Sequence, residues 1–71
     1  MLNQKLMDAA SKYFIDLIKD NKWAIVTISS YRPNEIQIEW GDKLRNERAI
    51  ATRTFFIEDD SIGFYTKGHA S

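Results

Sequence analysis

Residues 48–66 constrain the fold of this chain more than any other stretch. They contain two β-type runs, residues 50–57 and 62–66, separated by the polar segment EDDS at residues 58–61. Runs rich in β-branched and aromatic residues that flank a short turn-favouring segment predict a β-hairpin. The hairpin carries four aromatic side chains that the fold must accommodate: Phe55, Phe56, Phe64 and Tyr65.

Residues 2–20 have the apolar periodicity of an amphipathic helix. Asn3 is a candidate N-cap, and Asn21 suits the left-handed position that follows a helix. The apolar residues recur at steps of three and four and form one stripe: Leu2, Leu6, Ala9, Ala10, Tyr13, Phe14, Leu17 and Ile18.

Two more strands are predicted between this helix and the hairpin. Residues 23–31 are β-branched and aromatic, with no clearly polar face. Pro33 fits the second position of a turn, and residues 35–40 then alternate between apolar and acidic or amide side chains. Together the two runs predict a first hairpin.

Gly41 and Asp42 are expected to end that second strand. Residues 43–48 are charged and are expected to form a loop or a single helical turn, and residues 67–71 are expected to fray. The complete pattern predicts one α+β domain over residues 1–71. In it, an N-terminal helix packs on one face of a four-stranded antiparallel meander sheet.

One helix can cover only one face of such a sheet, whereas the adjacent aromatics Phe55 and Phe56 must place a ring on each face. Which of the two rings faces the helix stays open at this stage. The second face is either closed by twist, a bulge or the tail, or used as an interface. We favour an interface, because uncovered apolar patches usually mark binding sites.

The sequence therefore predicts a small non-enzymatic protein-interaction module that binds a partner or a second copy of itself through a sheet face and an edge strand. Arg53 lies in the middle of a strand. If it faces inward, it needs a carboxylate partner such as Glu35 or Glu39, or else a place at an interface. The predicted partner-binding residues are Trp23, Arg45, Arg48, Arg53, Phe55 and Tyr65.

The alternative prediction is a single-stranded nucleic-acid-binding protein, because arginines beside exposed aromatics can follow a phosphate backbone and stack on bases. The residues that would form this site are Tyr31, Lys43, Arg45, Arg48 and Arg53. Against it, ten basic and ten acidic residues give a net charge of zero, and no nucleic-acid-binding motif is present.

Other functions have little support in the sequence. His69 is the only histidine and lies near the end of the chain, and no glycine-rich phosphate loop is present, so we expect no enzyme and no cofactor. The acidic residues 58–60 lack the ligand spacing of a calcium loop and are interpreted as a solvated turn without a metal. No long apolar run suggests a membrane segment, and the absence of cysteine favours the cytoplasm. The composition is typical of small accessory proteins of bacteria and their phages.

Overall fold

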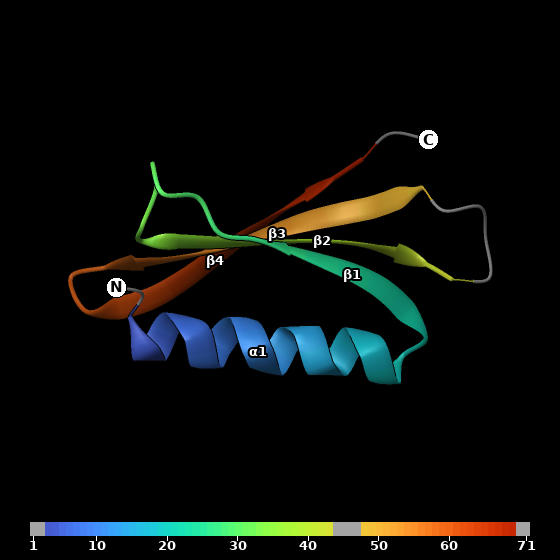
Figure 1. Ribbon diagram of the computed structural model, residues 1–71, viewed down its shortest axis with the longest axis horizontal. Coiled ribbons are helices and arrows are strands. Elements are labelled where there is room, and N and C mark those ends of the chain that lie inside the picture. Colours follow the sequence, from blue (N-terminus) through green and yellow to red (C-terminus); the bar gives the residue numbers. More distant parts are fainter. Residues whose placement is uncertain (1–2, 44–47, 70–71) are drawn as a thin grey trace.

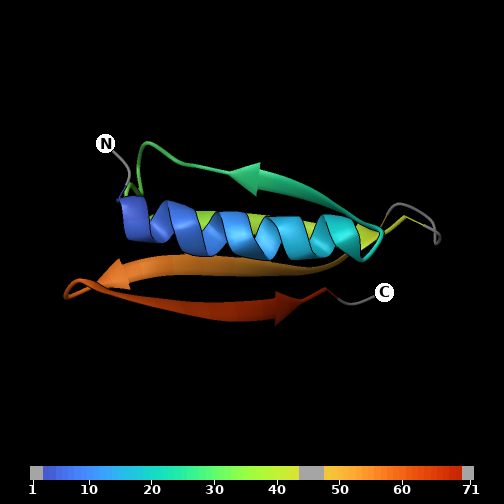
Figure 2. The same cartoon turned by 90° about the horizontal axis from the view of Figure 1, so that it is seen from below.

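The computed structural model describes residues 3–43 and 48–69. These residues form a helix and four strands in the order α1 (Gln4–Lys19), β1 (Lys22–Thr27), β2 (Glu35–Asp42), β3 (Ala49–Glu58) and β4 (Ser61–Gly68). Every neighbouring strand pair is antiparallel and the spatial order follows the sequence. α1 lies against one face of the twisted sheet and runs along the strands (Figure 1, Figure 2). The predicted helix on a four-stranded meander is confirmed.

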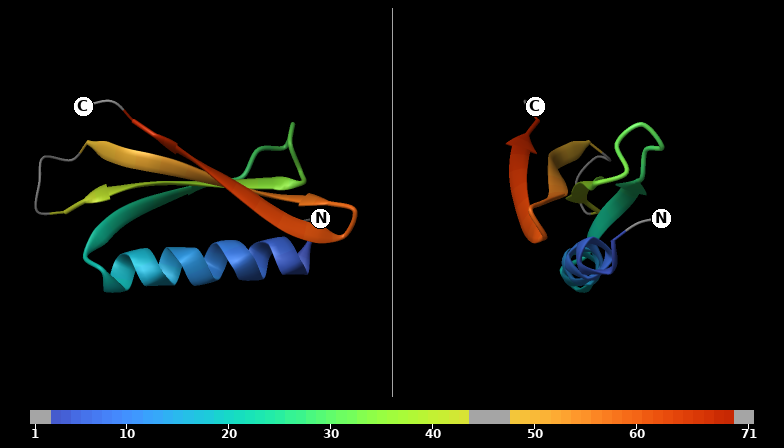
Figure 3. Two further views of the ribbon diagram at one scale, coloured as in Figure 1. Left: turned by 180° about the vertical axis from the view of Figure 1, so that it is seen from behind. Right: turned by 90° about the vertical axis from the view of Figure 1, so that its left-hand side faces the viewer.

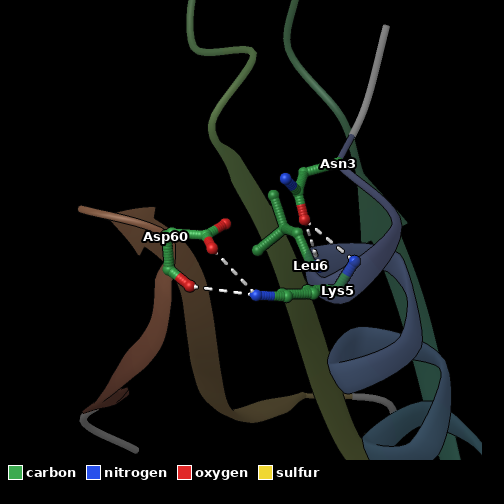
Figure 4. Close-up of polar contacts among 4 residues, drawn as sticks. All are labelled: Asn3, Lys5, Leu6 and Asp60. Carbon is green, nitrogen blue, oxygen red and sulfur yellow. Dashed lines mark hydrogen bonds and ion pairs between the residues drawn. The ribbon is translucent and has the colours of Figure 1, made fainter.

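Both ends of α1 have the predicted asparagines. The Asn3 Oδ1 atom accepts hydrogen bonds from the amides of Lys5, at 2.8 Å, and Leu6, at 3.4 Å (Figure 4). This satisfies two amides that have no partner within the helix. At the other end Asn21 has a φ of 60°, the left-handed conformation that ends many helices. Lys5 also contacts Asp60, which brings a negative charge to the N-terminal turn.

The core lies between α1 and the sheet face that carries the even-numbered residues of β2. Leu6 of the helix and Ile38 of β2 are fully buried, and Phe55 of β3 is 5% exposed. Phe55 therefore faces the helix, where its ring meets the Tyr13 ring edge-on at 5.6 Å. Phe56 faces the opposite side. The buried core residues are Leu6, Ala10, Leu17, Ile36, Ile38 and Phe55.

β1 is shorter than predicted, because the chain turns soon after Thr27. The hydroxyl of Ser29 accepts a hydrogen bond from the Tyr31 amide, and the Ser29 carbonyl accepts one from the Arg32 amide. Local bonds of this kind replace the strand pairing that residues 28–31 would otherwise make.

β2, in contrast, is longer than predicted. The expected break at Gly41 is wrong, since the strand continues to Asp42 and the register shifts between Trp40 and Gly41. A glycine inside a strand often marks such a bulge.

The hairpin of β3 and β4 turns through Asp59 and Asp60, whose φ values are 50° and 64°. Two successive left-handed residues are characteristic of the tight turn that matches the twist of a hairpin. β4 extends through Gly68, and the His69 amide donates to the carbonyl of Ile50 at 3.0 Å. Part of the expected tail is therefore strand. Residues 70–71, and residues 44–47 of the predicted loop, lie outside the described residues.

Candidate interaction surface

Four of the six predicted partner-binding residues are divided between two opposite faces of the sheet and do not form one surface; Arg48 is exposed just before β3, and Arg45 lies outside the described residues. Trp23 and Tyr65 lie on the open face, away from α1, as the strand registers require. Arg53 and Phe55 lie on the face that α1 covers. Phe55 is part of the core, so in this fold it is not available to a partner, and Phe56 is its solvent-side neighbour.

Arg53 faces inward, but its partners differ from the expected carboxylates. Its guanidinium lies 4.2 Å from the ring centroid of Tyr13 and 4.2 Å from that of Phe64. Its Nε also donates a hydrogen bond of 2.8 Å to the Thr66 hydroxyl. Aromatic faces attract cations through their quadrupole, which allows an arginine to be half-buried without an opposite charge beside it. Arg53 thus fastens α1 to β4.

The residues of the predicted nucleic-acid site are also dispersed. Lys43 and Arg48 are exposed where β2 ends and β3 begins, whereas Tyr31 precedes the start of β2 at the opposite end of the sheet. Arg53 lies between two rings, and Arg45 lies outside the described residues. The described members of this set therefore do not form a continuous basic and aromatic surface.

The open face of the sheet is partly closed by its own rings. Trp23 pairs with Gly41, and a Cβ atom at Gly41 would lie 2.6 Å from the indole ring. Phe56 pairs with Gly63 in the same way, again with 2.6 Å to the ring. Each ring thus lies against a glycine of the neighbouring strand, at a place where a larger residue would clash. The half-buried side chains that β2 places on this face are polar, at Glu35, Gln37 and Glu39. Beside them, Ile25 of β1 and Tyr65 of β4 are 54% and 52% exposed.

Another uncovered apolar surface lies along the side of α1 that faces β1. A groove of about 340 Å³ opens there, lined by Met7, Ala10, Ser11, Phe14, Ile15, Val26, Ile28 and Ile36. Figure 2 shows why it forms: β1 starts close to the C-terminal end of α1 and diverges from the helix along its length. Five aliphatic side chains of this region, which we call the β1 flank, are 40–54% exposed: Met7, Ile15, Ile18, Val26 and Ile28.

The outer edge of β1 borders the same flank. β1 is the first strand of the sheet and pairs only with β2 among the residues that the structure describes. The strand, KWAIVT, contains no proline, and its one charge is Lys22 at the very start, 3.9 Å from Asp42. Natural sheet edges are usually protected by charges, prolines or bulges, and β1 has none of these along residues 23–27. Its unpaired backbone groups therefore lie beside the exposed aliphatic side chains.

This surface is not among the predictions made from the sequence, although one signal indicates it. Met7 and Ile15 are large apolar residues of the helix that lie outside the predicted stripe. With Ser11 and Ile18 they form a second line at positions i, i+4, i+8 and i+11 of the helix. A helix with two apolar lines has more apolar surface than one sheet face can cover.

Other candidate sites have fewer supporting contacts. The ring nitrogen Nε2 of His69 is 2.7 Å from the Thr52 hydroxyl on an exposed part of the sheet. Within residues 3–43 and 48–69, no three acidic or histidine side chains group as metal ligands. In the same residues no helix is long and apolar enough to cross a membrane.

Comparison of the chain with models of protein families, with curated proteins and with solved structures found no match.

Proposed function

We propose that this protein is a small, non-enzymatic interaction module that binds another protein chain through the β1 flank. The observation that supports this most directly is the apolar groove between α1 and β1, with its five exposed aliphatic side chains. Contiguous apolar surface of this kind usually marks a site where a protein meets a partner.

The position of the groove suggests how a partner would bind. A chain that pairs with the outer edge of β1 would gain main-chain hydrogen bonds, and its apolar side chains would enter the groove. The sequence predicted a binding surface on the open sheet face. The proposed surface lies instead on the side of the molecule where the helix and an edge strand meet. The lack of cysteine suits a reducing compartment, and we place the protein in the cytoplasm.

Photo-crosslinking in the cells that naturally make the protein tests this proposal. A photoreactive residue replaces Ile15, which is 50% exposed on the β1 flank. The matched control replaces Ile50, which is 43% exposed on β3. We expect a protein adduct of defined mass from position 15 and little from position 50.

Three results would overturn the proposal. They are the absence of any protein adduct at position 15, equal adducts at both positions, and adducts that nuclease treatment removes. The last of these would favour the nucleic-acid alternative. An adduct with the mass of two chains counts as protein binding and leads to the inference below.

A further inference from the structure

We infer that the partner of the β1 flank is a second copy of this chain. In the proposed dimer, β1 pairs antiparallel with β1 of the second copy, and the two α1 helices lie antiparallel on the same side of one eight-stranded sheet. The inference rests on the proposed binding surface and specifies its occupant.

The β1 flank is suited to contact with its own copy. A two-fold interface brings the same patch of both copies together, so a patch that is charged with one sign repels itself. The residues that line the groove are apolar apart from Ser11, so the groove brings no such repulsion. The whole chain has ten basic and ten acidic residues, and a net charge of zero removes long-range repulsion between copies.

The middle of β1 and Ile15 of α1 lie at similar levels along the direction of the strand. The midpoint of β1 lies about 8 Å along the strand from Lys22, at about 3.3 Å per residue. Ile15 lies about 6 Å before the last residue of α1, at about 1.5 Å per residue. Since only Asp20 and Asn21 separate the two elements, Ile15 is close to the level of a two-fold axis through the middle of β1.

This axis determines which helical residues meet. Ile15 lies near its own copy, and Ile18 of one chain lies close to the level of Ser11 and Lys12 of the other. Paired strands are about 4.8 Å apart. α1 is nearest to β1 at its C-terminal end (Figure 2), so the two helices are closest in the half that carries Ile15 and Ile18. Large aliphatic residues opposite a small serine suit close helix packing, which occurs at about 8–10 Å between axes.

A stable dimer also requires an interface of sufficient size. A standard interface removes about 800 Å² from each partner. The accessible surface of this chain is 5345 Å², so such an interface would cover about 15% of it. The β1 flank extends along a helix of 16 residues, about 24 Å, together with a full edge strand. An interface of the standard size would therefore use the exposed side of α1 together with the whole edge of β1.

Sedimentation equilibrium of the whole chain tests the inference. We expect twice the chain mass of 8.3 kDa for the wild type. Ile15→Lys should weaken the dimer by at least about tenfold, because a lysine would be placed near its own copy at the axis. The matched control Ile50→Lys should leave the dimer unchanged. Circular dichroism verifies that each variant is folded. Folding is expected because Ile15 and Ile50 are 50% and 43% exposed.

Cysteine crosslinking tests the geometry independently of affinity. The chain contains no cysteine, so Ile15→Cys introduces a single thiol. Mild oxidation or a short bismaleimide linker should join two copies covalently through position 15, whereas Ile50→Cys should give no covalent dimer.

The outcomes separate this inference from the proposed function. A wild type that stays monomeric at its highest soluble concentration overturns the dimer. So does a dimer that Ile50→Lys breaks and Ile15→Lys does not, because its interface is then another face. If the chain is monomeric but position 15 still crosslinks to a different protein, only the choice of occupant was wrong. If neither association is seen, the proposed function fails as well.

Discussion

The two long sides of α1 are attached to the sheet in different ways. On the β4 side, Arg53 lies between the rings of Tyr13 and Phe64 and donates to Thr66, and Lys5 pairs with Asp60. On the β1 side, the described residues show no ion pair or side-chain hydrogen bond between helix and strand, and an apolar groove stays open.

This difference shows how a single helix packs on a sheet that is wider than the helix: one side is closed by contacts and the other side is left open. Directional contacts close the β4 side within the chain, and they specify one geometry because ring faces and hydrogen bonds have preferred orientations. The β1 side depends on non-directional apolar contact alone. Such a surface can accept a second chain without breaking any contact already made. The following predictions test whether the two sides differ in this way.

The largest effect is expected for Arg53→Ala on the β4 side. The change removes two cation–ring contacts, each about 0.5–2 kcal/mol, and a hydrogen bond of about 1 kcal/mol. We expect the free energy of unfolding to fall by about 2–3 kcal/mol in urea titrations. Arg48→Ala, at an exposed position, is the control and should change it by less than about 0.5 kcal/mol. Equal losses for both variants would show that Arg53 does not fasten the helix.

A smaller loss in the free energy of unfolding is expected for Thr66→Val. The variant keeps the shape of the side chain and removes only the acceptor of the Arg53 Nε hydrogen bond. Because this bond is exposed, we expect a loss of about 0.5–1 kcal/mol by the same urea titration. In the Arg53→Ala background, Thr66→Val should hardly change the free energy of unfolding. If the losses caused by the two substitutions are fully additive, the two residues act separately.

Lys5→Ala should have a still smaller effect. The Lys5 Nζ and Asp60 Oδ2 atoms are 3.1 Å apart, but the two side chains are 59% and 77% exposed, so solvent screens their attraction (Figure 4). We expect the free energy of unfolding to fall by no more than about 0.5 kcal/mol, and by less than this in high salt. A loss of the same size at low and high salt would contradict the electrostatic explanation.

The smallest effect on monomer stability is expected for Ile15→Lys on the β1 side. Ile15 is half exposed, so lysine at this position should change the free energy of unfolding by less than about 0.5 kcal/mol. The measurement uses protein diluted until sedimentation shows single chains. A loss as large as that of Arg53→Ala would mean that the β1 flank is part of the core and not an interaction surface.

Much of the fold could be predicted from periodicity alone. The steps of three and four in residues 2–20 and the alternation in residues 35–40 gave the helix and β2. The two left-handed aspartates agree with the short loop predicted at residues 58–61. The parity of β3 could not be predicted, because both faces of residues 50–57 are largely apolar and only packing against Tyr13 distinguishes Phe55 from Phe56.

The surface was less predictable, for two physical reasons. The environment of Arg53 depends on three elements that are distant in sequence, so no local pattern shows that rings would replace a carboxylate. The groove lies where β1 diverges from α1 (Figure 2), and this divergence depends on how helix and sheet pack, which no local pattern specifies. Sequence patterns therefore indicated that apolar surface was in excess, and the fold determined on which side of the molecule it is exposed.

The two rings that lie over glycines on the open face also affect how the chain reaches its fold. A β-hairpin can slip by two residues and still keep its apolar side chains on the correct face. In β3 and β4, which form one long twisted hairpin (Figure 3), such a slip would move Phe56 from Gly63 to a position whose side chain would clash with the ring. Gly41 has the same role for Trp23 across β1 and β2. The glycines thus select the correct strand alignment during folding, so their replacement should increase misaligned species as well as lower stability.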